Sequence, residues 1–236
     1  MLRGDRILAV IPARGGSKRI KNKNTLLLAE KPLLTWTIDA AKGSKYIDKV
    51  VVSSDSEEIR RIAIEAGAEA PFLRPPNLSG DQASSADVVL HSLNFLSERG
   101  ESFDTCILLQ PTSPLRSAVH IDEAIELHKK VEAKSVISVT NVGHPIEWVN
   151  ELGDAGQMDS FFTKDSVYKR SQDYPERYMI NGAIYIFGID QFLVQETYFF
   201  EHGSYAYVMK NKDSIDIDTY EDFHLAEMFL RPPFNQ

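Results

Sequence analysis

The sequence predicts an α/β domain over residues 1–236, built on a mostly parallel β-sheet with helices on both faces. Two observations predict this fold class. Short apolar runs alternate with longer segments of helical periodicity over the first two thirds of the chain. Several of these runs also end in polar or turn residues, and such strand ends meet at one edge of a parallel sheet. We expect a ligand at that edge.

The alternation is clearest before residue 140. Pro32 suits the first turn of a helix, and Ser56 and Gly67 suit the two ends of the next one. The predicted elements are strand 7–12, helix 33–41, strand 49–53, helix 56–66, strand 68–73, helix 84–96, strand 105–110, helix 121–131 and strand 135–139.

Residues 141–179 interrupt this alternation. They combine prolines and glycines with several aromatic residues, which need burial somewhere. One interpretation is an excursion packed on its own domain, and the other is an arm packed on a second subunit. Regular structure resumes with predicted strands over 181–187 and 204–208 and a closing helix over 219–230.

Composition excludes several classes of protein. The chain has 43% apolar and 25% charged residues and a net charge of −8, which argues against general nucleic-acid binding. No apolar stretch approaches the length of a membrane span, and we see no signal peptide. The single cysteine, Cys106, lies in an apolar run and is predicted to be a buried packing residue. A reducing compartment, the cytoplasm, fits this usage.

The loop after the first predicted strand is the strongest functional signal. Gly15 and Gly16 permit a tight turn and a close approach to a ligand. Five cations lie within ten residues of this loop: Arg14, Lys18, Arg19, Lys21 and Lys23. In an acidic protein this concentration predicts a phosphate-containing ligand, although a solvated basic turn is the simpler alternative. The spacing fits neither the P-loop nor the dinucleotide fingerprint.

Two aspartates near the C-terminus form a second candidate site. The run from Ser214 to Thr219 alternates polar and apolar residues, which predicts a strand with Asp216 and Asp218 on one side. Two carboxylates so placed, together with substrate phosphates, suit Mg²⁺. The alternative for Asp218 is a helix cap paired with Glu221.

Between these sites lies the turn from Gln110 to Arg116, which two prolines make rigid. It presents Gln, Thr, Ser and Arg side chains that could read a base edge or a sugar. It could also be only a well-capped connection.

Taken together, four motifs resemble the bacterial acylneuraminate cytidylyltransferases and their relatives that act on legionaminic or pseudaminic acid. The motifs are residues 11–18 (IPARGGSK), 108–116 (LLQPTSPLR), 181–185 (NGAIY) and 216–218 (DID). The resemblance implies a Rossmann-like nucleotidyltransferase fold with a mixed, mostly parallel sheet. It implies transfer of CMP from CTP to a sialic-acid-like nonulosonic acid, dependence on Mg²⁺, and a homodimer with 141–179 as an inserted dimerisation arm.

The resemblance also assigns site residues. Those implied to bind CTP are Arg14, Ser17, Lys18, Lys23, Asn24, Arg74, Ser85 and Asn181. Those implied to meet the sugar are Gln110, Thr112, Ser113 and, from the arm, Arg170. Asp216 and Asp218 match the metal ligands, and with Arg14 and Lys23 they form the expected catalytic set.

Two positions depart from the family pattern. Met179 stands where many sialic acid enzymes carry an arginine, and Glu147 where the family carries a lysine. Both lie on the sugar and arm side, so they leave the identity of the sugar open. The rival interpretations are a 3-deoxy-octulosonate cytidylyltransferase and a protein that binds CTP without turning it over.

Overall fold

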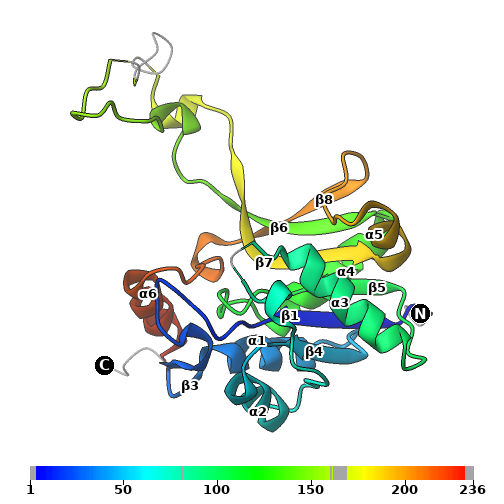
Figure 1. Cartoon of the computed structure of the whole chain (residues 1–236). Helices are drawn as coiled ribbons and strands as arrows, with labels where there is room; N and C mark the ends of the chain where they lie inside the picture. The colour runs from blue at the N-terminus through cyan, green and yellow to red at the C-terminus, as the bar shows by residue number, and fades with distance from the viewer. Residues whose placement is uncertain (1–3, 81, 160, 162–168, 232–236) are drawn as a thin grey trace.

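The computed structural model describes residues 4–80, 82–159, 161 and 169–231. Six strands form one sheet in the order β4-β1-β5-β7-β6-β8 (Figure 1). The strands are β1 (Ile7–Pro12), β4 (Lys49–Ser53), β5 (Thr105–Leu108), β6 (Ser135–Asn141), β7 (Tyr178–Gly188) and β8 (Ser204–Met209). Strand β7 runs antiparallel to both neighbours, while the other pairs are parallel. The predicted mixed, mostly parallel sheet is confirmed.

Helices cover both faces of the sheet, as predicted. Successive β1 residues point to opposite faces, so Ala9 and Ile11 join one apolar core and Leu8 and Val10 the other. The first core is closed by α1 (Leu33–Lys42), α2 (Glu57–Glu65) and α4 (Ala118–Lys130). The second is closed by α3 (Ser85–Ser97) and α5 (Ile189–Gln195), and it buries Cys106.

A third, smaller core joins the two ends of the chain. Helix α6 (Tyr220–Leu230) packs Phe223 and Ala226 against Ile20, Leu28 and Leu33. The contact involves a short hairpin, β2 (Leu27–Leu28) and β3 (Lys31–Pro32). Single-turn 3-10 helices occur at η1 (Lys23–Thr25), η2 (Pro76–Leu78), η3 (Ile146–Trp148), η4 (Ser171–Asp173) and η5 (Asn211–Asp213).

Side-chain caps fix the starts of the helices near the sheet edge. Ser56 accepts a hydrogen bond from the Ile59 amide at the start of α2. At α3, Ser84 and Asp87 form a capping box that leaves Ser85 in the first turn. The described part of the chain contains no helix long and apolar enough to cross a membrane.

Three predictions about elements need correction. The segment 68–73 makes only isolated bridges, Val51 to Glu69 and Ser54 to Leu73, and is not a strand. Residues 214–217 belong to no sheet either. The capping box of α6 is formed by Thr219 and Asp222, one residue later than predicted, so Asp218 is not the cap. Sequence patterns also did not predict α5 or the hairpin.

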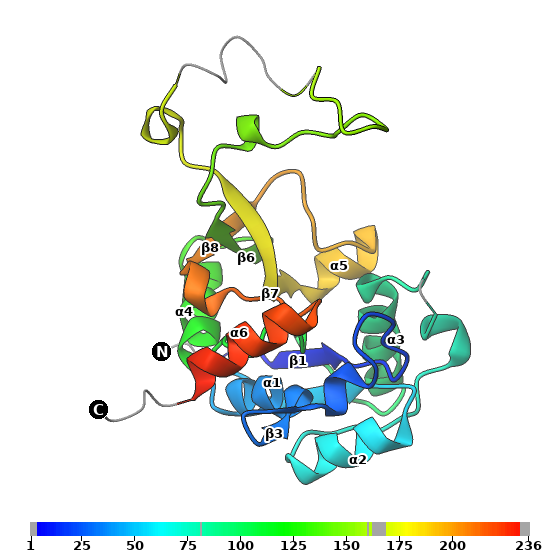
Figure 2. The same cartoon turned by 90° about the vertical axis from the view of Figure 1, so that its left-hand side faces the viewer.

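The segment between β6 and β7 extends away from the body of the protein (Figures 1 and 2). It carries exposed apolar side chains that contact no core: Ile146, Trp148, Val149, Leu152 and Met158. Three residues at its base, Tyr178, Met179 and Ile180, are also exposed. Of the predicted arm, residues 160 and 162–168 lie outside the described part. This geometry fits a projecting arm; its role in dimerisation stays a prediction.

Candidate active site

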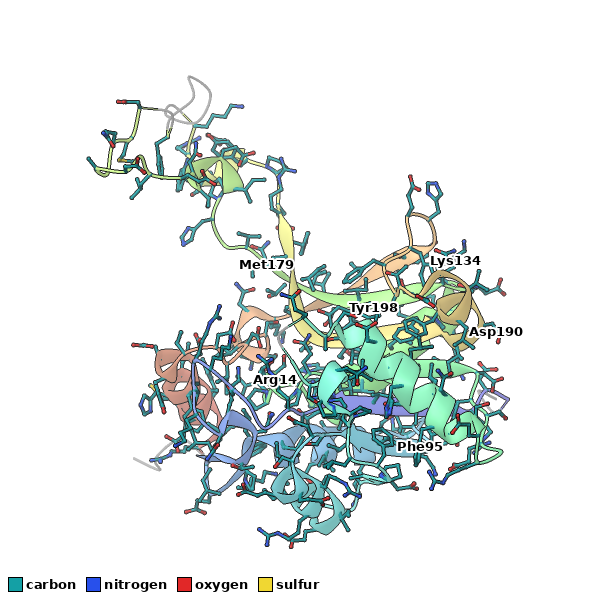
Figure 3. All side chains as sticks on the ribbon, in the orientation of Figure 1. Arg14, Phe95, Lys134, Met179, Asp190 and Tyr198 are labelled. Carbon is teal, nitrogen blue, oxygen red and sulfur yellow. The ribbon has the colours of Figure 1, made fainter. Side chains whose placement is uncertain are left out.

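A cleft of about 310 Å³ opens at the edge of the sheet where β1 and β5 end. Arg14 lies just beyond the end of β1 (Figure 3). The structure brings eight predicted site residues together in the cleft wall: Arg14, Ser17, Lys23, Asn24, Arg74, Ser85, Gln110 and Thr112. They come from three separate stretches of sequence, and the topology of the sheet is what makes them neighbours.

Side-chain and backbone contacts fix the cationic loop. The Asn24 amide donates to the Arg14 carbonyl at 2.9 Å, and the Ser17 amide donates to the Gly15 carbonyl at 3.1 Å. The Gly15 amide donates to Oδ1 of Asp55 at 2.8 Å. These hydrogen bonds therefore fix the conformation of the loop, which is not a freely solvated basic turn.

Lys23 connects this loop to the C-terminal carboxylates. Its half-buried Nζ donates to the Ile217 carbonyl at 2.6 Å and lies 3.4 Å from Oδ1 of Asp218. Arg19 pairs with the other oxygen of Asp218 at 2.6 Å. Loop cations and the Asp216–Asp218 segment thus form one charged cluster beside the cleft.

The segment around Asp216 is extended although it is not in the sheet. The Ile217 amide donates to the Thr112 carbonyl at 2.8 Å, and the Ile217 side chain is fully buried. Asp216 and Asp218 therefore face away from the core, as predicted, through a different local structure. Asp216 opens to solvent, yet the protein around it partly desolvates its carboxylate and raises its pKa. The Thr112 hydroxyl acts against this rise and Asp218 adds to it.

The described residues contain no cluster of three or more histidines, cysteines or carboxylates that could hold a metal alone. Two carboxylates with an open side fit the chemistry of Mg²⁺, which takes its remaining oxygen ligands from substrate phosphates and water. To bind Mg²⁺, Asp218 would have to give up its ion pair with Arg19.

Gln110 is placed in the cleft by β7. Between Ile137 and Val139 of β6 the pairing register shifts, so β7 bulges over residues 181–184. Gly182 sits in this bulge at φ +76°, where a Cβ would lie 3.0 Å from Oε1 of Gln110 and 4.0 Å from Oδ2 of Asp216. Because Gly182 has no side chain, the side chains of Gln110 and Asp216 have space beside it.

Two predicted contacts do not line the cleft. Asn181 is 4% exposed; its side-chain oxygen accepts from Ser138 and its side-chain nitrogen donates to Ser214. Ser113 is fully buried, and its hydroxyl has no hydrogen-bond partner among the described residues. Contact of either residue with a substrate stays a prediction.

Two other predicted contacts also lie outside the cleft wall. Lys18 is exposed in the loop. Arg170 is exposed on the arm and pairs with Asp173 at 3.3 Å. A position on the arm is what the prediction of reaching a second subunit requires, and that prediction stays untested.

Two residues organise the site in ways that sequence reasoning did not predict, and the first of them was expected to face a ligand. Arg116 is 2% exposed and donates to the carbonyls of Gln110 and Ala183 at 3.1 and 2.9 Å, joining the turn after β5 to β7. Burial lowers the pKa of Arg116 to about 9, so it remains charged at neutral pH. The other is Asp55, whose position directly after a strand was the available signal.

The fold and the site thus define an α/β protein with cations after β1, a polar turn after β5 and a carboxylate pair beside both. A family model described as cytidylyltransferase matches residues 8–232. The chain belongs to the cytidylyltransferase family.

Curated relatives confirm the resemblance. The N-acylneuraminate cytidylyltransferase of Escherichia coli is 40% identical over 222 residues, or 94% of this chain, which spans 51% of that protein. The CMP-N,N'-diacetyllegionaminic acid synthase of Legionella pneumophila is 37% identical, with 95% and 96% of the two chains covered. A pseudaminic acid cytidylyltransferase of Campylobacter jejuni is 36% identical, with the same coverage. The chain thus spans about half of the first relative and nearly all of the other two.

Solved structures agree on the fold. A CMP:2-keto-3-deoxy-manno-octonic acid synthetase complexed with CTP superposes with a TM-score of 0.70 at 15% identity, covering 95% of this chain and 98% of that one. A 4-diphosphocytidyl-2C-methyl-D-erythritol synthase from Anaerococcus prevotii gives 0.66 at 16% identity, covering 97% and 99%. At these identities the likeness concerns the fold alone.

Proposed function

We propose that this chain transfers CMP from CTP to a sialic-acid-like nonulosonic acid and releases pyrophosphate. The observation that carries the proposal is one cleft lined by two unlike sets of groups. Arg14 and Lys23 supply positive charge, and Gln110 and Thr112 supply hydrogen-bonding groups. Relatives 36–40% identical over most of this chain are named for three nonulosonic acids, which supports the acceptor class.

In the proposed reaction a hydroxyl of the sugar acid attacks the α-phosphorus of CTP. One P–O bond forms, the bond to the β-phosphate breaks, and pyrophosphate carries away the negative charge. Arg14, Lys23 and Arg74 would neutralise that charge as it develops, and Gln110 and Thr112 would orient the acceptor. The described residues of the cleft wall include neither a histidine nor a carboxylate, so we propose water or Asp216, which lies near Gln110 and Thr112, as the proton acceptor.

We propose Asp216 and Asp218 as the protein ligands of Mg²⁺. When bound, the ion would neutralise phosphate charge and help to align the reacting oxygens. Arg19 and Lys23, which now contact Asp218, would then be free to turn toward phosphate. This assignment rests on the chemistry of the carboxylate pair and its position beside the cations.

We further propose a homodimer in which the arm packs on the second subunit and Arg170 approaches that subunit's substrate. Exposed apolar side chains along the arm support this, because burial against a partner would remove them from water. We also propose a cytoplasmic location, which rests on the intracellular supply of CTP.

A pyrophosphate-release assay tests the function. The purified chain is mixed with CTP, Mg²⁺ and, separately, sialic, legionaminic, pseudaminic and 3-deoxy-octulosonic acids. Release with at least one of the first three, and little with the fourth, is the expected result. Release with the octulosonic acid alone would support the rival enzyme, and CTP binding without release would support a non-catalytic binder.

A further inference from the structure

Residues 53–56, at the end of β4, hold two parts of the cleft at once. Backbone carbonyls of Ser53 and Ser54 accept from the amides of Ala13 and Arg74 at 2.9 and 2.7 Å. Asp55 accepts from the Gly15 amide, and Ser56 caps α2. This short segment therefore links the cationic loop to the stretch that carries Arg74.

Among the contacts described, Asp55 is the one residue of this segment whose side chain contacts both the cationic loop and Arg74. Its Oδ1 lies 2.8 Å from the Gly15 amide nitrogen and 3.9 Å from Nη2 of Arg74. The Arg74 side chain is 4% exposed, and its Nε has no partner among the described residues. A fixed anion next to a buried cation keeps that cation in place.

The charges of Arg14 and Arg74 explain why a carboxylate, that of Asp55, lies at a site proposed to bind the negatively charged CTP. Burial lowers the pKa of Arg74, the charge of Asp55 acts against this, and the nearby charge of Arg14 adds to it. Before CTP binds, Arg14 and Arg74 repel one another across the cleft. Asp55 offsets this repulsion, although its charge alone would disfavour a phosphate.

The backbone at Gly15 depends on the same segment. A Cβ at Gly15 would lie 3.2 Å from Cβ of Ser56 and 3.8 Å from Oδ1 of Asp55. The loop thus packs closely on residues 55 and 56, and the Asp55 hydrogen bond fixes how it turns.

We propose that Asp55 is a positioning residue for CTP. It fixes the Gly15–Gly16 turn through the Gly15 amide and holds Arg74 toward the cleft until a triphosphate takes over the neutralising charge. The inference rests on the proposed binding of CTP at this loop.

The test compares Asp55→Ala and Asp55→Asn with Asp48→Ala. Asp48 is a matched control, because its Oδ2 also accepts a backbone amide, that of Ile7 at 2.7 Å, but at the opposite end of β1. KM for CTP, KM for the sugar acid, kcat and the thermal midpoint are measured for each variant.

We expect Asp55→Ala to raise KM for CTP about tenfold or more, with a much smaller change in KM for the sugar acid. Asp55→Asn should raise it severalfold, because an amide oxygen still accepts from Gly15 but no longer attracts Arg74. Asp48→Ala should lower the thermal midpoint without changing KM for CTP. Equal changes in KM for CTP in Asp55→Ala and Asp48→Ala would overturn the proposal. If the alanine variant does not fold, a wild-type KM in Asp55→Asn overturns it.

Arg14→Ala separates this inference from the proposed function. If Arg14→Ala leaves KM for CTP unchanged, the loop does not bind the triphosphate and the proposed site is wrong. If Arg14→Ala raises it and neither Asp55 variant does, only the role of Asp55 is wrong.

Discussion

At the scale of single residues, Asp216 is under opposing influences. Partial desolvation raises its pKa, and the Thr112 hydroxyl and Lys23 stabilise its charged form. It also lies near Gly182, as Gln110 of the cleft wall does. A carboxylate in that position is suited to act on both substrates.

Asp216→Asn keeps the shape of this side chain and removes its charge. We expect kcat to fall by at least about 100-fold, because an amide is a poor Mg²⁺ ligand. Steady-state turnover with Mg²⁺ checks this, with Asp190→Asn on α5 as a control that should behave like the wild type (Figure 3). Near-normal turnover in Asp216→Asn would contradict the assignment of Asp216 as a Mg²⁺ ligand.

The residues that could be predicted are those whose chemistry is local. Arg14 and Lys23 were identifiable because cations cluster around two glycines in an acidic chain. The burial of Asn181 and Ser113 could not be predicted, because a motif shows which residues occur together and not which way a side chain points. The internal role of Arg116 could not be predicted either, because its acceptors, the Gln110 and Ala183 carbonyls, are backbone groups with no sequence signature.

At the scale of elements, the bulge of β7 is the feature that shapes the cleft. Its positive-φ residue, Gly182, places a backbone turn where a side chain would strike Gln110. Ser138 on β6 keeps the bulge in register by accepting from the Ile184 amide at 2.7 Å. An irregularity in the sheet thus leaves room for the Gln110 side chain, which lines the cleft.

Gly182→Ala tests this. Two effects are expected: strain at positive φ, which lowers stability by about 1 kcal/mol, and displacement of Gln110, which raises KM for the sugar acid. Gly100→Ala is the matched control, since Gly100 has φ +77° and a Cβ added there would meet no atom within 4 Å. It should lose similar stability and keep full activity. Matching kinetics in the two variants would show that the bulge does not position Gln110.

Elements were predictable where pattern and length agreed. The six sheet strands and helices α1 to α4 were found because apolar period and capping residues coincide, whereas α5 was not. The alternation over residues 214–219 correctly buried Ile217, yet the segment joins no sheet, and its backbone bond to the turn after β5 is the one from the Ile217 amide to the Thr112 carbonyl. A two-residue strand such as β2 has too few positions to show any period.

At the scale of the whole molecule, the arm exposes apolar side chains to solvent when the chain is a monomer. Val149 and Leu152 are 71% and 61% exposed. We expect the wild type to sediment as a dimer and the double variant Val149→Asp with Leu152→Asp to shift toward monomer, because buried charge opposes association. Val194→Asp on α5, at a residue 83% exposed, should leave the mass unchanged. A wild-type monomer in analytical ultracentrifugation would contradict the homodimer.

Stability should depend on pH through three histidines. Burial lowers the pKa values of His91, His120 and His128 below the ordinary 6.5. Below that pH the unfolded chain binds protons that the folded chain resists, so stability falls as the pH falls. The thermal midpoint should therefore drop from pH 7 to pH 5.

His128 gives the sharpest version of this experiment, because its Nε2 is buried without a partner among the described residues. His128→Gln should flatten the dependence of the thermal midpoint on pH, whereas the same change at exposed His202 should not. Equal slopes in the two variants would rule out His128 as a source of the effect.

The bond from Lys23 to the Ile217 carbonyl spans 194 positions of sequence. Because synthesis delivers the N-terminal part first, the cationic loop emerges long before the segment that holds it. All six sheet strands can pair before residue 217 leaves the ribosome, but the cleft cannot be completed until then. Nascent chains that stop before residue 217 should therefore fold a sheet and remain inactive, which delays any activity at the cleft until that segment has been made.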